Sequence, residues 1–168
     1  MASIRILSLA LAGSVLAGSL VAPAFAQGVI TEKRLSAPLV SEAVATAVAT
    51  CAAQGYNVTA VMVDMGGQRQ GMLRGDGAPL HSVEGAYMKA YTSVTYREDT
   101  GVLQGRLKDG QMNGFQMKLP NIAVQDGAVI IKIDNVAIGA LGVGGAPGGD
   151  KDTACAKAGV AKISDRMK

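Results

Sequence analysis

Apolar and polar residues follow two different periods along this chain. Val40, Val44 and Val48 recur at helical spacing, which predicts a helix that begins after Ser36 as its N-cap and ends near Gly55. Similar spacing or capping predicts further helices over residues 80–96, 100–110 and 149–166.

Four short apolar runs have the length of strands, at residues 58–63, 68–73, 128–133 and 136–143. Turn residues connect the first two runs (64–67) and the last two (Asp134 and Asn135), which predicts two hairpins. Hairpins build an antiparallel sheet, and the first and last helices can pack together on one of its faces. The expected fold class is therefore α+β. Residues 111–121 are hard to assign, because Pro120 interrupts an alternation of apolar side chains.

The stretch from residue 136 to residue 159 is rich in glycine and leads from a strand through a tight loop into the last helix. Glycines inside the strand predict that another element packs closely against its backbone. The loop from Gly144 to Pro147 leaves free N–H groups near a helix start, where an anion can bind, but it also suits a structural turn. The Lys-Ser/Thr of a P-loop and the spacing of a dinucleotide fingerprint are absent.

Residues 1–26 have the composition of a secretory signal peptide. Arg5 supplies the positive charge, residues 6–21 form an apolar run, and Ala24-Phe25-Ala26 is a cleavage signature. The small residues and the cleavage signature favour a cleaved leader over a membrane anchor. We expect a single mature domain of residues 27–168, periplasmic or secreted, with no stable membrane anchor after cleavage.

Charge and aromatic content argue against a nucleic-acid partner. The formal net charge is +3, the basic residues are dispersed, and only 4% of residues are aromatic.

Two cysteines, Cys51 and Cys155, lie in a chain that we expect to be exported. An oxidising compartment permits a disulfide between them, but two separately buried thiols fit the sequence equally well. Their spacing fits neither structural zinc nor covalently attached haem.

His81 is the only histidine of the chain. One histidine cannot build a metal site of several imidazoles, but it can be one axial ligand of haem iron. Gly85, Met88 and Lys89 follow on nearby helical faces and would offer room for a flat ring and a cation for a carboxylate. A solvated surface histidine is the alternative. The methionines form no metal-binding cluster, and most suit core packing.

Arg74, Asp76, Lys89 and Asp152 form the most suggestive polar set, together with the loop at Gly144 and Gly145. Arginine and lysine in one pocket would suit a carboxylate ligand, whereas ion pairs that stabilise the fold are the alternative. With a single histidine and no serine elbow motif, a hydrolytic triad has little support, and we assign no catalytic residue.

Four separated segments resemble the GlcG/HbpS-type family of haem-binding, or haem-degrading, domains: residues 61–67, 73–78, 88–93 and 142–159. The positions that match the family motifs are Asp64, Arg74, Asp76, Lys89, Thr92, Gly145 and Asp152. The chain departs from the family pattern at Gly75, where methionine is usual, and over residues 111–125.

This resemblance implies a profilin-like α/β/α sandwich with a five-stranded antiparallel sheet, non-covalent haem binding and homo-oligomers. We expect an exported haem-binding protein, with His81 as the candidate iron ligand. The candidate ligand-binding residues are Arg74, Asp76, Lys89, Thr92, Gly144 and Gly145. Two alternatives stay open. One is an enzyme or accessory subunit acting on a small carboxylate or aldehyde in a pocket around Arg74 and Lys89, and the other is a structural subunit without a small ligand.

Overall fold

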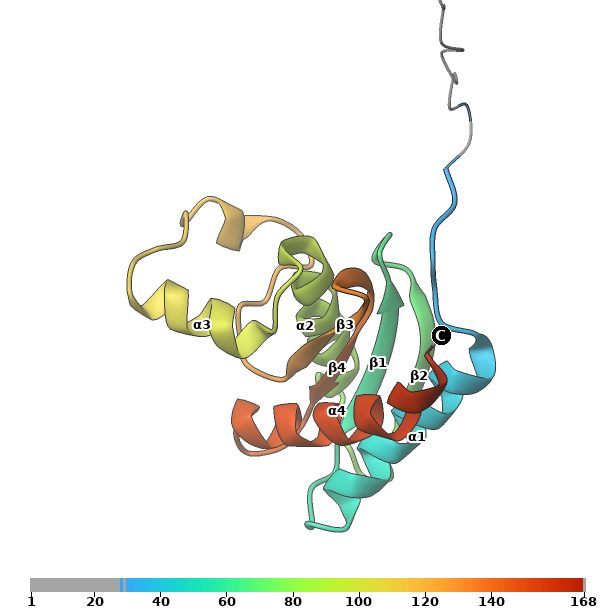
Figure 1. The fold of residues 1–168 in the computed structure, drawn as a ribbon. Coiled ribbons are helices and arrows are strands. Elements are labelled where there is room, and N and C mark those ends of the chain that lie inside the picture. The colour runs from blue at the N-terminus through green and yellow to red at the C-terminus, as the bar shows by residue number, and fades with distance from the viewer. Residues whose placement is uncertain (1–27, 29, 168) are drawn as a thin grey trace, which may run out of the picture. The chain divides into compact units, whose positions relative to one another are not determined.

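A four-stranded antiparallel sheet, in the order β2-β1-β4-β3, lies at the centre of the fold (Figure 1). The computed structural model describes residues 28 and 30–167, so the predicted leader over residues 1–26 lies outside the described residues. The strands are β1 (Thr59–Asp64), β2 (Arg69–Arg74), β3 (Ala128–Ile133) and β4 (Val136–Gly144). Both predicted hairpins are present.

The expectation of a fifth strand, which came from the family resemblance, is wrong for the described residues. The stretch between α3 (Thr100–Lys108) and β3 holds a short 3-10 helix (Gln116–Lys118) instead of a strand. Pro120 follows this turn, and proline lacks the N–H group that a strand needs for its ladder.

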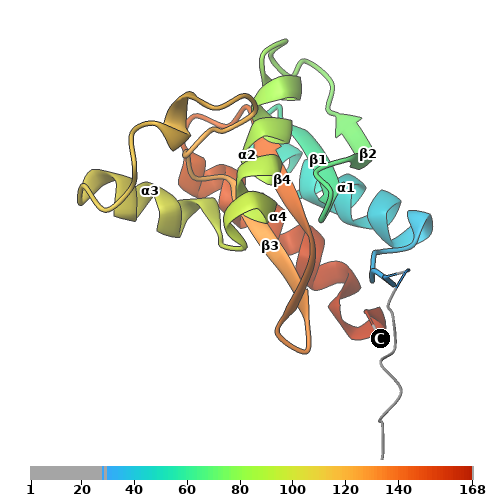
Figure 2. The same ribbon diagram turned by 90° about the horizontal axis from the view of Figure 1, so that it is seen from above.

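Helices cover both faces of the sheet. Helices α1 (Ala37–Ala52) and α4 (Gly149–Ile163) lie side by side on one face, and α2 (Ser82–Tyr96) packs on the other (Figures 1 and 2). The first and last helices of the domain therefore share one face, as the sequence predicted. The predicted last helix ends as an α-helix at Ile163 and continues as a 3-10 helix (Ser164–Arg166). Of the helices within the described residues, none has the length and apolarity needed to cross a membrane.

Strand β1 is buried on both of its faces, which explains the apolar run from Ala60 to Val63. Ala60 and Met62 belong to the core cluster under α1 and α4, whereas Val61 and Val63 belong to the cluster under α2. Successive side chains of a strand point to opposite faces, so a strand covered on both sides buries every one of them.

Glycines in β4 allow α2 to lie directly on the strand. A Cβ atom at Gly142 would overlap the carbonyl oxygen of Ala86 and would lie 2.8 Å from the nitrogen of Ala90. Both atoms belong to the backbone of α2, which confirms the close approach expected from glycines within a strand.

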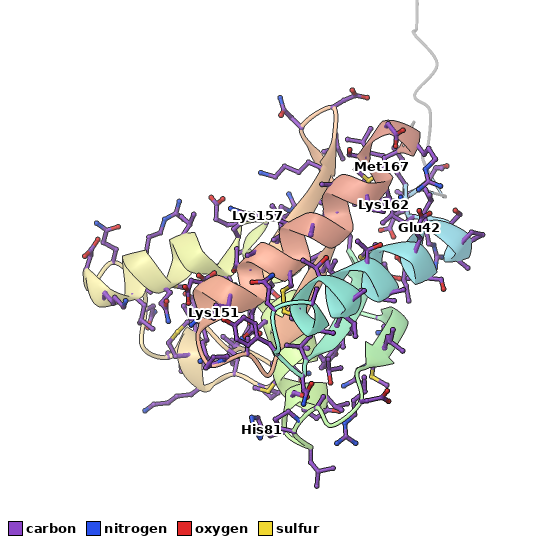
Figure 3. All side chains as sticks on the ribbon, turned by 90° about the horizontal axis from the view of Figure 1, so that it is seen from below. Glu42, His81, Lys151, Lys157, Lys162 and Met167 are labelled. Atoms are coloured by element: carbon purple, nitrogen blue, oxygen red, sulfur yellow. A yellow bond between two sulfur atoms is a disulfide. The ribbon has the colours of Figure 1, made fainter. Side chains whose placement is uncertain are left out.

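A disulfide between Cys51 and Cys155 joins α1 to α4, with 5.6 Å between the two Cα atoms (Figure 3). The bonded pair is therefore the correct one of the two alternatives that the sequence left open. Both cysteines are fully buried, on the sides of α1 and α4 that form the core.

Candidate functional site

A buried ion pair connects α2 to the first turn of α4. Lys89 Nζ lies 2.7 Å from Asp152 Oδ2, and the two side chains are only 6% and 3% exposed. Lys89 Nζ also donates a hydrogen bond to the Val143 carbonyl at 3.2 Å, and Asp152 Oδ1 accepts one from the Ala146 N–H at 3.0 Å. Each charge is thus held by several partners inside the protein, as a buried charge requires.

Asp126 lies beside this pair and completes a polar network. Its Oδ1 accepts hydrogen bonds from the Gly127 N–H at 2.9 Å and from the Thr153 hydroxyl. Gly127 has a φ of +135°, and a Cβ there would lie 2.6 Å from Lys89 Nζ. Neither Asp126 nor Gly127 was among the predicted site residues, because Asp-Gly before a strand is an ordinary turn signal.

Burial raises the pKa of the Asp152 carboxyl above its ordinary value. The hydrogen bond and positive charge of Lys89 and the Ala146 N–H oppose this effect, whereas the nearby Asp126 adds to it. Lys89 and Asp152 are therefore engaged with each other inside the fold, which favours the structural interpretation of the polar set over a ligand-binding one.

The glycine loop before α4 is held by the chain's own carboxylates. Asp150 and Asp152 lie in the first turn of α4, where negative charge interacts favourably with the helix N-terminus. Gly145 has a φ of +121°, and a Cβ at Gly149 would lie 2.6 Å from the Asp126 carbonyl oxygen. A Cβ at Gly144 would lie 3.2 Å from the Ala86 nitrogen, so this loop fits closely against α2 and behaves as a structural turn.

Two other motif residues hold neighbouring loops in place. The buried Thr92 hydroxyl donates to the Met88 carbonyl at 2.7 Å and accepts from the Ala123 N–H at 2.8 Å, which fastens the segment before β3 to α2. Asp64 Oδ1 accepts from the N–H groups of Gly66 and Gln68, both at 3.0 Å, and so shapes the first hairpin turn.

A pocket of about 290 Å³, open to solvent, lies where α1 ends and β2 ends. Polar side chains of Tyr56, Asn57, Arg74 and Asp76 line it, together with apolar residues that include Leu73. Arg74 Nε donates to the Ala78 carbonyl at 3.0 Å, so the guanidinium also organises the loop after β2. The structure brings Arg74 and Asp76 together here, but Lys89 does not line this pocket.

His81 lies at the start of α2, on the outside of the protein (Figure 3). Within residues 30–167 its imidazole has no hydrogen-bond partner, and no group of three or more His, Cys, Asp or Glu side chains is placed to hold a metal ion. Gly85, one turn later, has open space beside it, because a Cβ there would meet no atom within 4 Å. The imidazole is thus accessible, but the Lys89 ammonium expected beside it is buried in its ion pair.

Comparison with known proteins gives a consistent assignment. The sequence model of a family described as "Haem degrading protein HbpS-like" matches residues 35–161. A crystal structure of HbpS is 29% identical, with 84% of this chain and 99% of that chain covered and a TM-score of 0.77. A double mutant of HbpS from Streptomyces reticuli is 30% identical, with coverages of 84% and 97% and a TM-score of 0.76.

A crystal structure of a PduOC–haem complex is 26% identical to this chain. The match covers 78% of this chain and 96% of the PduOC chain, with a TM-score of 0.72. Among curated protein sequences, none matches. Because the family match extends over most of the domain, from residue 35 to residue 161, the chain belongs to the family of HbpS-like haem-degrading proteins.

Proposed function

We propose that this chain is an exported protein that binds haem non-covalently, in haem or iron handling or as an accessory of redox sensing. The observation that carries the proposal is its similarity to PduOC, solved as a complex with haem, over 96% of that chain. The Cys51–Cys155 disulfide supports export to the periplasm or beyond, since disulfides persist in oxidising compartments. The family resemblance adds homo-oligomers to the proposal.

His81 is the iron ligand in this proposal. An imidazole is a common axial ligand of haem iron, and bound haem would supply a redox-active iron. The ring of His81 is exposed, and the open space beside Gly85 leaves room for a flat group along the outer side of α2. The exposed imidazole and the space beside it support this ligand assignment, whereas the pairing of Lys89 with Asp152 speaks against Lys89 as a partner for the haem carboxylates.

A hemin titration of residues 27–168, followed by absorbance with albumin and free hemin as references, tests this function. We expect a saturable Soret shift with whole-number stoichiometry, and its loss in His81→Ala. Leu80→Ala is the matched control, because Leu80 is the adjacent residue and is 80% exposed. A featureless, unsaturable rise would reject haem binding. A normal shift in His81→Ala would reject only the ligand assignment.

A small-carboxylate ligand, bound by an enzyme or by an accessory subunit, is the second candidate function. The pocket of about 290 Å³ that joins Arg74 to Asp76 favours it. This volume lies just below the usual range of ligand pockets, about 300–1,000 Å³. An aldehyde condensed on Lys89 has less support, because that ammonium is paired with Asp152.

Calorimetric titration with short-chain carboxylates tests the second candidate. We expect binding that Arg74→Ala abolishes and Arg106→Ala preserves, since Arg106 pairs with Glu98 and does not line the pocket. Absence of heat with every carboxylate, or equal heat in both variants, would reject it.

A further inference from the structure

Two opposite charges line the pocket at the ends of α1 and β2, yet they do not pair with each other. Arg74 is the last residue of β2, and Asp76 follows in the loop after it. Among the described residues, neither side chain forms an ion pair with any group. Both residues are exposed. The pocket therefore offers one positive and one negative group, each able to bind a charge of opposite sign.

The guanidinium of Arg74 is held in place while most of its donors stay available. Its Nε donates a hydrogen bond to the Ala78 carbonyl at 3.0 Å, and its Nη2 donates to the same oxygen. A guanidinium has five N–H donors, so three remain for a ligand. Because the bonds to a neutral carbonyl fix the group but leave its charge unbalanced, a carboxylate can bind it without first breaking an ion pair.

The loop that carries Asp76 is fixed to the rest of the fold. The Gly75 N–H donates to the Val58 carbonyl at 2.9 Å, and the Ala78 N–H donates to the Gly75 carbonyl at 3.1 Å. Asp76 thus lies in a turn whose backbone is hydrogen-bonded on both sides. Its position relative to Arg74 is set before a ligand binds, which lowers the entropy that binding costs.

Much of the remaining wall of the pocket is apolar. Val48 and Ala52 of α1 contribute to it, together with Leu73 of β2. Leu73 is 40% exposed, although it is a large apolar side chain. A ligand with an apolar group would remove this surface from water, which is favourable. The pocket therefore combines an apolar wall with two charges of opposite sign.

Gly75 keeps this space open. A Cβ atom there would lie 3.1 Å from Val48 Cγ1 and 3.0 Å from the Val58 carbonyl oxygen, and both valines line the pocket. Gly75 does not have a positive φ, so this glycine provides space and not a special backbone conformation. A larger residue, such as the methionine that is usual at this position of the family motif, would begin its side chain against the wall of the pocket and reduce its volume.

We infer that this pocket binds a small zwitterion, namely an α-amino acid with an apolar side chain. The carboxylate of the ligand meets Arg74, its ammonium meets Asp76, and its side chain contacts the apolar wall. The inference rests on the second candidate function, a small-carboxylate ligand, and names the class of carboxylate. A ligand with a single charge would leave the other charged side chain of the pocket without a partner, which lowers its affinity.

Calorimetric titration at neutral pH with three compounds of similar size tests the need for both charges. Leucine carries an ammonium and a carboxylate, isocaproate carries only the carboxylate, and isoamylamine carries only the ammonium. We expect the protein expressed from the full sequence to bind leucine about tenfold more tightly than either of the other two, the difference that one hydrogen bond to a charged group gives.

Two variants test the assigned residues. Asp76→Asn keeps the shape of the side chain but removes its charge, so the preference for leucine over isocaproate should fall from about tenfold to nearly none. Asp109→Asn is the matched control and should keep the preference, because Asp109 follows the end of α3 and does not line the pocket. Gly75→Met should abolish leucine binding while the circular dichroism stays that of the wild type.

The outcomes separate this inference from the second candidate function. Isocaproate bound as tightly as leucine, or an equal preference in Asp76→Asn and the wild type, would overturn the amino-acid ligand and leave the small-carboxylate function standing. Isoamylamine bound as tightly as leucine, or absence of heat with all three compounds, would overturn both. A folded Gly75→Met variant that binds leucine normally would overturn the assignment of the ligand to this pocket.

Discussion

Lys89 Nζ and Asp152 Oδ2 meet at 2.7 Å, although 63 positions separate the two residues in the sequence. Lys89 belongs to α2 on one face of the sheet, and Asp152 belongs to α4 on the other. The ion pair therefore ties the two helical layers together beside the end of β4, where Lys89 also bonds the Val143 carbonyl.

Removing one partner of this pair should strongly destabilise the fold. Lys89→Met leaves the Asp152 carboxylate buried without its counter-charge, and we expect a loss of about 3–5 kcal/mol in the free energy of unfolding. The double variant Lys89→Met/Asp152→Leu should be less destabilised than the single one. Urea unfolding followed by circular dichroism measures both. Arg106→Ala, which breaks an exposed pair with Glu98, should cost less than about 1 kcal/mol. A similarly small loss for Lys89→Met would contradict the prediction.

The raised pKa of Asp152 gives a defined pH dependence. Between the ordinary value of 3.8 and the raised pKa, the native state binds the proton more tightly than the unfolded chain does. The stability from this group is therefore complete below pH 3.8 and is lost as pH rises through the raised pKa. We expect the free energy of unfolding of the wild type, relative to Asp152→Asn, to decrease over this window. Urea unfolding of both proteins at a series of pH values checks the sign, and a relative increase would refute it.

Two glycine substitutions should have opposite effects. Gly142→Ala places a methyl group against the backbone of Ala86 and Ala90, and we expect a loss of about 3 kcal/mol, because the helix must move to admit it. Gly85→Ala adds a methyl group within a helix where space is open, and should gain about 0.5–1 kcal/mol. Thermal melts of the two variants give the comparison. A neutral Gly142→Ala would show that α2 does not lie directly on β4.

The disulfide should contribute a substantial part of the stability. The bond joins residues 104 positions apart, and its removal in a Cys51→Ala/Cys155→Ala variant should cost about 2–5 kcal/mol. Urea midpoints of the variant, the oxidised wild type and the reduced wild type measure this. The variant should resemble the reduced protein, and a midpoint equal to that of the oxidised protein would argue against the bond.

Local sequence signals predicted the parts of this fold that depend on local chemistry. Asp134 and Asn135 predicted the turn of the second hairpin, and both residues have positive φ in the structure. The glycines of β4 predicted the close approach of another element, which is α2. The stretch around Pro120 could not be assigned, because it belongs neither to a regular strand nor to a long helix.

The arrangement of the polar set depended on tertiary structure and could not be predicted in the same way. Lys89 was grouped with Arg74 by chemistry, but α2 directs it toward α4, whereas Arg74 ends an edge strand. Only the packing of α2 against β4 decides where the lysine side chain ends. The disulfide was equally undecided, because the distance between two helices is not encoded in the spacing of their cysteines.

The pairing of α1 with α4 has a consequence for the order of folding. These helices are the first and the last of the domain, and together they cover one apolar face of the sheet. Because the chain is synthesised from its N-terminus, this face cannot be covered completely until α4 has been made. The bond between Cys51 and Cys155 cannot form before then either. Such late closure leaves this apolar face of the sheet uncovered until the chain is nearly complete. Complete folding after synthesis would suit the export that we propose for this chain.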